Sequence, residues 1–215
     1  MEQKVLLTGF EPFGGEKLNP SWEAVKQLHG EVIDGVTLVA EQIPTVFGKS
    51  VEVIEKLIQQ YNPDIVICVG QAGGRLHITP ERVAININDA RIPDNKGNQP
   101  IDEPIVDKGP VAYWSTLPIK RMVKNMQESN IPASVSHTAG TFVCNHIFYG
   151  LMDYITRTSL SIRGGFIHIP FIPEQTINKE APSLSLEAIV EGIKIAAVTA
   201  AKYKSDIHTV GGTTH

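Results

Sequence analysis

Residues 136–150, with the sequence SHTAGTFVCNHIFYG, place a cysteine where nucleophilic chemistry is favoured. Cys144 follows a turn of small residues, Ala139 to Thr141. Apolar side chains then recur at the spacing of a helix that begins here: Val143, Ile147, Phe148, Leu151 and Ile155. With Thr141 as N-cap, Cys144 lies in the first turn, where unpaired N–H groups and the helix dipole favour an anion. The pattern predicts a stabilised thiolate beside N–H groups that can receive the oxyanion of an attacked carbonyl.

The chain has two cysteines, and their surroundings differ. Cys68 lies inside the apolar run DIVICVG at 64–70, where cysteine acts as a small hydrophobic residue and a buried thiol is inert. We therefore assign Cys68 a structural role. Cys144 can equally be a packed helix residue, so the residues alone leave both interpretations of it open.

A cysteine nucleophile needs a base, and His168 is the histidine best placed for this role. It stands near the end of GGFIHIP at 164–170, a predicted strand that Pro170 ends. Catalytic groups gather beyond the carboxyl ends of parallel strands, so we expect His168 and Cys144 at the same sheet edge. A hydrogen-bonded core histidine is the alternative. His146 is only two positions from Cys144 and points elsewhere on the helix.

Glu81 is the candidate for the group that orients the imidazole. In ERVAINI at 81–87 it falls in register with Val83, Ile85 and Ile87, which form the apolar face of an alternating strand. A carboxylate on a buried face must be paired, because an unpaired buried charge is costly. The alternative is an exposed Glu81 paired with Arg82 or Arg75, and the pattern alone favours that alternative.

Two loops with glycines follow predicted strands. TGFEPFGG at 8–15 lies where nucleotide-binding folds hold phosphate, yet it matches neither GxGxxG nor GxxxxGK[ST]. Its Phe10 and Phe13 suit a flat, uncharged ring, although core phenylalanines are commoner. GQAGGR at 70–75 either presents backbone groups to a ligand or simply turns the chain.

Alternating strand and helix patterns must position these residues. We expect buried strands at 4–8, 36–43 and 64–70, with a helix capped by Asn19 after the first and one capped by Thr45 after the second. This order predicts a parallel sheet with helices on both faces. Residues 88–110 have little periodicity and indicate a long loop. The later elements are a helix at 118–129, a strand at 133–136, the Cys144 helix, a strand at 162–169 and a helix at 183–203.

Composition limits the class of protein. The 215 residues are 42% hydrophobic and 20% charged, which fits one globular domain over 1–215. The net charge is −4 without a basic run, so nucleic acid and anionic membranes are poor partner candidates. Residues 1–10 are not typical of a signal peptide, and the apolar stretch at 193–201 is too short to span a membrane. Two cysteines in such a chain indicate reduced thiols in the cytosol.

Taken together, these blocks resemble the pyroglutamyl peptidase I family of cysteine peptidases, also called pyrrolidone-carboxylate peptidases. The resemblance covers essentially the whole chain and rests on TGFEPFGG with NPS at 19–21, GQAGGR followed by PERVAININDARIPDN, SHTAGTFVCN, and GGFIHIP. It implies a catalytic triad of Glu81, Cys144 and His168, which reverses the preference for an exposed Glu81. It also implies an α/β fold, a three-layer α/β/α sandwich with a mostly parallel central sheet.

The same resemblance implies a function and a substrate site. Members remove N-terminal pyroglutamyl residues from peptides through a thioester acyl-enzyme, are cytosolic, need no metal or cofactor, and are commonly homotetramers. Six residues are implied to bind the substrate: Phe13 and Phe142 around the lactam ring, Phe10 and Val143 completing the pocket, Gln71 contacting the lactam, and Arg91 assisting the Cys144 N–H in the oxyanion hole.

Two other functions stay open on the residues alone. A phosphorylase-type glycosyl transferase fits the α/β architecture and the glycine-rich loops, but neither loop has a lysine placed to bind an anion. A redox-sensing or binding protein would use Cys144 as a reactive thiol without turning over peptides. Fold alone decides neither case.

Overall fold

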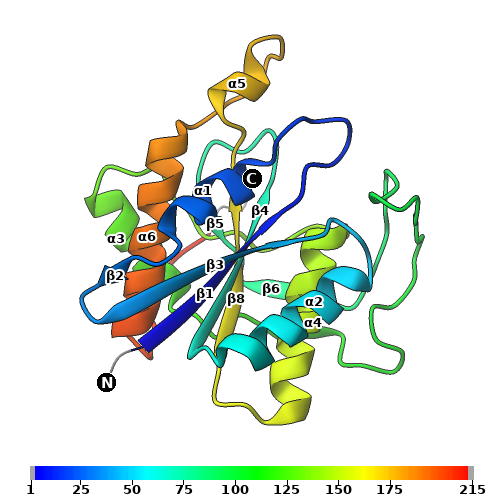
Figure 1. Ribbon diagram of the computed structural model, residues 1–215, viewed down its shortest axis with the longest axis horizontal. Coiled ribbons are helices and arrows are strands. Elements are labelled where there is room, and N and C mark those ends of the chain that lie inside the picture. Colours follow the sequence, from blue (N-terminus) through cyan, green and yellow to red (C-terminus); the bar gives the residue numbers. More distant parts are fainter. Residues whose placement is uncertain (1–2, 213–215) are drawn as a thin grey trace.

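The computed structural model describes residues 3–212 and is built around a six-stranded sheet with the order β2-β3-β1-β4-β8-β5 (Figure 1). The four central strands are parallel: β1 (Gln3–Phe10), β3 (Val36–Ile43), β4 (Ile65–Gln71) and β8 (Arg163–Ile169). Short antiparallel strands form the edges, β2 (Val32–Ile33) and β5 (Thr79–Pro80). A separate ribbon pairs β6 (Val83–Ile85) with β7 (Ala112–Trp114).

Helices cover both faces of this sheet, so the predicted α/β/α sandwich is confirmed (Figure 1). One layer contains α1 (Pro20–Val25), α3 (Ile119–Glu128) and α6 (Leu186–Lys202), and α1 continues as a 3₁₀ turn, Lys26–Leu28. The other layer contains α2 (Lys49–Tyr61) and α4 (Val143–Thr158). The short α5 (Pro173–Thr176) follows β8 beyond the carboxyl edge of the sheet.

Alternation along β4 and β8 decides which side chains face α4. In β4, Val66 and Cys68 pack with α2 and α4, while the residues between them pack against α1, α3 and α6. In β8, Phe166 packs on the same side as Cys68. His168 is two residues further on, and its ring lies 4.7 Å from that of Phe166. The imidazole therefore points toward the α4 layer at the carboxyl edge.

The two predicted helix caps have different outcomes. Asn19 caps α1 as predicted, because its side-chain oxygen accepts from the Ser21 N–H. The Thr45 prediction is wrong, since α2 begins after Gly48, whose φ of +68° suits a residue without a Cβ. The Thr45 hydroxyl instead donates to the carbonyl of Glu11.

The strand expected at 133–136 is present only as single bridges, Ile78 with Ala133 and Glu81 with Ser136. The Ser134 and Ser136 N–H groups donate to the carbonyls of Ile78 and Pro80. Pro80 has no N–H to return to this ladder, which breaks it in the middle. A proline on the partner strand thus explains why the prediction was wrong.

Residues 88–110 form the predicted long loop, and hydrogen bonds fix it in place. The buried Asp94 carboxylate accepts from the N–H groups of Phe47, Lys96 and Asn98. The Asn95 N–H donates to the carbonyl of Thr45. The loop is therefore tied to the segment before α2.

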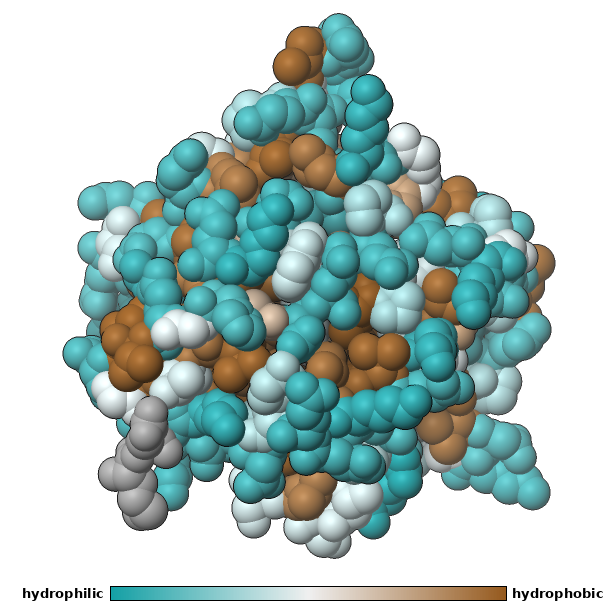
Figure 2. Space-filling view, viewed as in Figure 1, coloured by the Kyte–Doolittle hydropathy of each residue, from teal (hydrophilic) through white to brown (hydrophobic). Residues whose placement is uncertain are grey.

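The face of the molecule in Figure 2 is mainly hydrophilic, with small apolar patches. On β7 and beside it, Trp114 and Val111 are exposed apolar side chains. None of the helices within residues 3–212 is both long and apolar enough to cross a membrane.

Candidate active site

Cys144 lies in the first turn of α4, as predicted, but Thr141 is not the cap. The N-cap is Phe142 and the helix starts at Val143, so Cys144 is its second residue. The Thr141 hydroxyl donates to the Asp89 carbonyl at 2.8 Å, and the Asp89 N–H donates to the Thr141 carbonyl at 3.0 Å. The turn that presents the thiol is thus fastened to the 88–110 loop.

Gly70, at the end of β4, leaves room for this thiol. A Cβ on Gly70 would lie 2.8 Å from Cys144 Sγ and 2.7 Å from the Phe166 ring. Gly70 is also the register partner of His168 on β8, and neighbouring strands lie about 4.8 Å apart. The thiol and the imidazole are therefore neighbours on one side of the sheet.

Glu81 holds the imidazole from the turn between β5 and β6. Its Oε1 lies 2.7 Å from His168 Nδ1, and its N–H donates to the Phe166 carbonyl at 2.9 Å. The Glu81 side chain is 0% exposed and that of His168 is 4% exposed. A carboxylate only accepts, so Nδ1 carries the proton and Nε2 is left with its lone pair.

The alternation that led to Glu81 is not the reason for its burial. In β6 the buried residue is Ala84, whereas Val83 and Ile85 are only partly buried. The turn after Pro80 breaks the strand, so the register of Glu81 does not continue into β6. The carboxylate is buried because Glu81 is held against β8, through its side chain to His168 and through its N–H to the Phe166 carbonyl.

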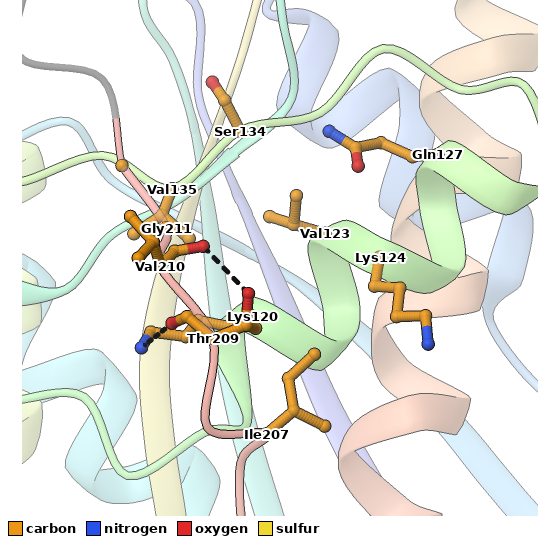
Figure 3. Close-up of a pocket in the computed structure, with 11 residues that line it drawn as sticks. Lys120, Val123, Lys124, Gln127, Ser134, Val135, Ile207, Thr209, Val210 and Gly211 are labelled. Atoms are coloured by element: carbon orange, nitrogen blue, oxygen red, sulfur yellow. Dashed lines mark hydrogen bonds between the residues drawn. The ribbon is translucent and has the colours of Figure 1, made fainter.

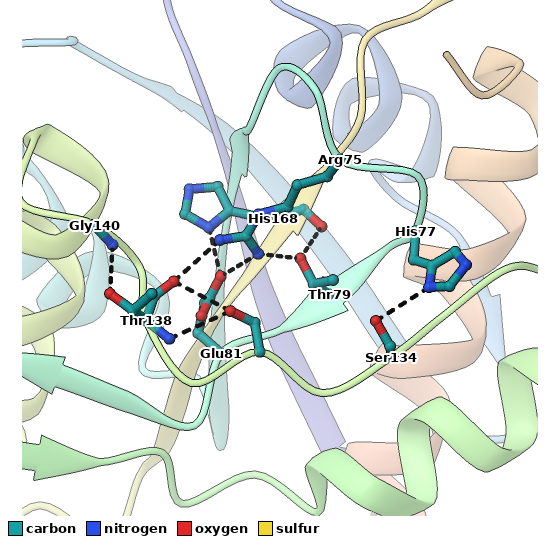
Figure 4. A network of polar contacts seen from close by, with 9 residues as sticks. Arg75, His77, Thr79, Glu81, Ser134, Thr138, Gly140 and His168 are labelled. Carbon is teal, nitrogen blue, oxygen red and sulfur yellow. Dashed lines mark hydrogen bonds and ion pairs between the residues drawn. The ribbon is translucent and has the colours of Figure 1, made fainter. Parts of the chain in front are cut away.

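The pairing that the sequence offered as an alternative is also present. Arg75 Nη1 lies 2.7 Å from the same Glu81 Oε1 that faces His168 (Figure 4). Arg82, the other arginine considered, contacts His137 Nδ1 at 3.1 Å and the Gly211 carbonyl at 2.9 Å. One carboxylate oxygen thus faces both an imidazole and a guanidinium.

Burial sets the protonation states of the site. Burial lowers the pKa of His168 although Glu81 acts to raise it, so the imidazole is neutral. Burial alone would raise the pKa of Glu81, but the interactions with His168 first and then the charge of Arg75 outweigh it, and this pKa lies below its ordinary value. Glu81 is therefore ionised.

The surroundings of Cys144 oppose the thiolate that the helix N-terminus favours. Burial raises the pKa of Cys144 to about 12, the Glu81 charge raises it further, and Arg75 acts in the opposite direction. The directions of both pKa shifts favour a neutral thiol and a neutral imidazole before substrate binds.

Three phenylalanines gather at the N-terminus of α4. The ring centroids of Phe13 and Phe142 are 6.1 Å apart, with an angle of 38° between the planes. Phe47 contacts Phe142 edge-on at 5.4 Å. Phe47 lies just before α2, and the sequence pattern does not mark it for this cluster. The predicted Phe13–Phe142 pair is close together, with Phe47 as a third member.

The other implied binding residues occupy different environments. Phe10 is 2% exposed against Phe166 in the core, and Val143 is also fully buried. Gln71, at the end of β4, accepts from the side chain of Gln175 at 2.9 Å. Arg91 is exposed on the 88–110 loop, two residues after the Asp89 anchor. Gln71 thus lies at the carboxyl end of β4, Arg91 is exposed on the loop, and Phe10 and Val143 are part of the core.

Cys68 is completely buried in β4, and burial raises the pKa of its thiol to about 12. A cavity of about 390 Å³ lies elsewhere, between α3 and the C-terminal segment (Figure 3). Its walls include Lys120, Val123, Ile207 and Val210. Neither feature contributes to the cluster around Cys144. Within residues 3–212, no three His, Cys, Asp or Glu side chains gather as a metal site.

Comparisons with known proteins show what this chain is similar to. The family model described as pyroglutamyl peptidase matches residues 3–203. Pyrrolidone-carboxylate peptidase of Bacillus licheniformis is 66% identical over 99% of this chain and 99% of its own. A crystal structure of pyroglutamyl peptidase I from Bacillus amyloliquefaciens has a TM-score of 0.97 at 64% identity, covering 98% of this chain and 100% of that one. Pyrrolidone carboxyl peptidase of Pyrococcus furiosus has a TM-score of 0.90 at 45% identity, covering 93% and 99%.

Proposed function

This chain belongs to the pyroglutamyl peptidase family, and we propose that it removes N-terminal pyroglutamyl residues from peptides as a cysteine exopeptidase. The observation that carries the proposal is the hydrogen bond between buried Glu81 and His168, beside a thiol accommodated by Gly70. Family membership favours this reaction over the glycosyl transferase and the redox sensor. The catalytic domain is the whole chain, 1–215.

The reaction begins with proton transfer from the Cys144 thiol to His168 Nε2 as sulfur attacks the carbonyl after the pyroglutamyl ring. The resulting imidazolium donates its proton to the leaving amine, and a thioester remains on Cys144. His168 then takes a proton from water, which attacks the thioester and releases pyroglutamate and the thiol. Glu81 stabilises the imidazolium in both steps, because its carboxylate already faces Nδ1.

The oxyanion formed in each attack lies at the N-terminus of α4. The first N–H groups of a helix lack intrahelical partners, and that of Cys144 is among them. We assign Arg91 as a second donor, since its loop is anchored to the turn before Cys144. The guanidinium of an exposed arginine can move onto the oxyanion when substrate binds.

The lactam ring lies between Phe13 and Phe142 in this proposal. Their 6.1 Å separation is a direct ring contact, so the two rings must separate to admit a planar ligand. Phe10 and Val143 support this pocket from the core, and Gln71, held by Gln175, contacts the lactam. A prolyl ring lacks the lactam carbonyl and would leave the polar group that binds it unpaired.

Assembly and location follow the family resemblance. We propose a cytosolic homo-oligomer, a tetramer, that needs no metal or cofactor. Both cysteines of the chain are free, which fits a reducing compartment. The exposed Val111 and Trp114 are candidates for burial between subunits.

The test is hydrolysis of a fluorogenic pyroglutamyl amide by the reduced protein, with the prolyl amide as control. We expect turnover that a chelator leaves intact and prior iodoacetamide abolishes, and a kcat/KM at least about 10³-fold higher than for the prolyl amide. Folded, reduced protein without turnover would contradict the peptidase. Equal rates for the two amides would contradict the lactam pocket alone.

A further inference from the structure

Arg75 is the one guanidinium in direct contact with the candidate triad within residues 3–212. It stands in the bend between β4 and β5, and its side chain is 26% exposed. Its Nη1 lies 2.7 Å from Glu81 Oε1, the oxygen that also faces His168 Nδ1 at 2.7 Å. Neither the proposed acyl transfer nor the lactam pocket explains this cation.

The same side chain reaches two further segments of the site (Figure 4). Nη1 also donates to the Thr79 hydroxyl, which lies 3.4 Å from the His168 carbonyl. Nη2 donates to the Thr138 carbonyl at 3.0 Å, in the turn that leads into α4 and Cys144. Arg75 thus joins the Glu81 turn, the strand that carries His168 and the turn before the nucleophile.

We propose that Arg75 is a positioning residue of the reaction, which holds the ionised Glu81 against His168 and ties both to the turn that presents Cys144. This inference rests on the proposed peptidase function. A completely buried carboxylate needs an opposite charge, and the neutral imidazole does not supply one. The guanidinium fork supplies that charge and fixes the geometry at the same time.

Because Arg75 and His168 share Glu81 Oε1, Arg75 also limits the basicity of His168. When the imidazole is protonated, two cations face Glu81 Oε1, and their repulsion favours return of the proton. Two charged groups act on the imidazole, Glu81 from the segment between β5 and β6 and Arg75 from the β4–β5 bend, and the Cys144 thiol lies on the same side of the sheet. Of these, Arg75 alone is a fixed cation.

Substituting Arg75 tests this role through the pH profile of kcat/KM. In Arg75→Gln the cation is lost, so imidazolium forms more easily and the acidic limb moves to higher pH, by about one unit. At a pH on that limb kcat/KM falls roughly tenfold, while KM changes less than about twofold because the lactam pocket is untouched. Arg75→Lys keeps the charge and loses the fork, so its limb stays near that of the wild type while kcat falls.

Arg82→Gln is the matched control, because Arg82 follows Glu81 in the chain but its side chain contacts His137 and Gly211 instead of the candidate triad. We expect its acidic limb to stay at the wild-type position. An NMR titration of His168 gives the same comparison without turnover, and circular dichroism checks folding. Should Arg75→Gln not fold, Arg75→Lys decides alone: a shifted limb or an unchanged kcat overturns the proposal.

The outcomes separate this inference from the peptidase itself. An inactive wild-type protein would remove the proposed function. An active wild type whose Arg75→Gln variant keeps its limb and its His168 titration would overturn only the role of Arg75. In Arg75→Gln, a lower kcat without any shift of the acidic limb would assign Arg75 a packing role and would likewise overturn the proposal.

Discussion

Two buried histidines lie on the same side of the sheet, and their partners separate their roles. His168 donates through Nδ1 to the Glu81 carboxylate, so its Nε2 keeps a lone pair on the side of the sheet where Cys144 lies. His146, on α4, accepts the Gly48 N–H through Nε2 at 2.8 Å and donates through Nδ1 to the Asn88 side-chain oxygen at 2.9 Å. Both nitrogens of His146 are therefore engaged.

Burial alone does not make a histidine catalytic. Burial lowers the pKa of both imidazoles, that of His146 to about 4. Only His168 has a carboxylate that stabilises the transient imidazolium. His146 instead has an N–H donor that would clash with an added proton. The chemistry thus depends on which groups face the ring.

The largest expected difference between the two histidines is in turnover. His168→Ala should lower kcat by about 10⁴-fold or more, because both proton transfers lose their carrier. His146→Asn should keep kcat within about tenfold and lower the free energy of unfolding. Steady-state kinetics measure kcat of both variants, and urea unfolding measures their stability. Comparable losses of kcat would contradict the distinction between the two histidines.

Changing the side chain that faces each histidine tests whether this partner sets the role of the imidazole. Glu81→Gln keeps the shape of the side chain but cannot stabilise the imidazolium, so kcat should fall about 10³-fold. Asn88→Asp offers a carboxylate to His146 and should raise the pKa of that imidazole while kcat stays within a few-fold of wild type. Kinetics with NMR titration of His146 measure both effects. Full activity in Glu81→Gln would contradict the role of the carboxylate.

From the burial of His146 we predict that the folded protein loses stability in acid. The pKa of His146 is about 4 in the folded chain and about 6.5 in the unfolded one, so between these values the unfolded chain binds the extra proton. Stability is complete above about pH 6.5 and falls toward pH 4, by about 3 kcal/mol from this group. Urea unfolding at several pH values should show that the free energy of unfolding falls less steeply with decreasing pH in His146→Asn than in the wild type. An identical slope would mean that His146 does not titrate as described.

The smallest effect concerns the activity profile of the wild type. His168 acts as a base only when it is neutral, and burial lowers its pKa below the ordinary value near 6.5. The acidic limb of kcat/KM should therefore lie below pH 6.5. A midpoint clearly above 6.5 would show that Glu81 outweighs burial and that the ion pair forms before substrate binds.

Much of this arrangement is predictable from local patterns. The apolar runs of β4 and β8 and the helical spacing after Cys144 predict the sheet, α4 and the shared edge. The caps at Thr45 and Thr141 were wrong because a glycine turn and the Asp89 contact replace them, neither of which is a local signal. The Arg75–Glu81 pairing was one of the alternatives that the sequence offered, whereas the contact of Arg75 with Thr138 and that of Phe47 with Phe142 join distant segments that no periodicity encodes. The ionisation of Cys144 depends on burial of its thiol, which only the packed structure reveals.

Trapping the acyl-enzyme tests the central claim most directly. Protein mixed with a pyroglutamyl ester, quenched in acid and digested, should carry one pyroglutamyl group as a thioester on the peptide that contains Cys144, as read by mass spectrometry. The peptide with Cys68 serves as the internal control and should stay unmodified. A pyroglutamyl group on Cys68 would contradict the account. Turnover of the ester with no thioester detected on Cys144, in the wild type and also in His168→Ala, would contradict it as well.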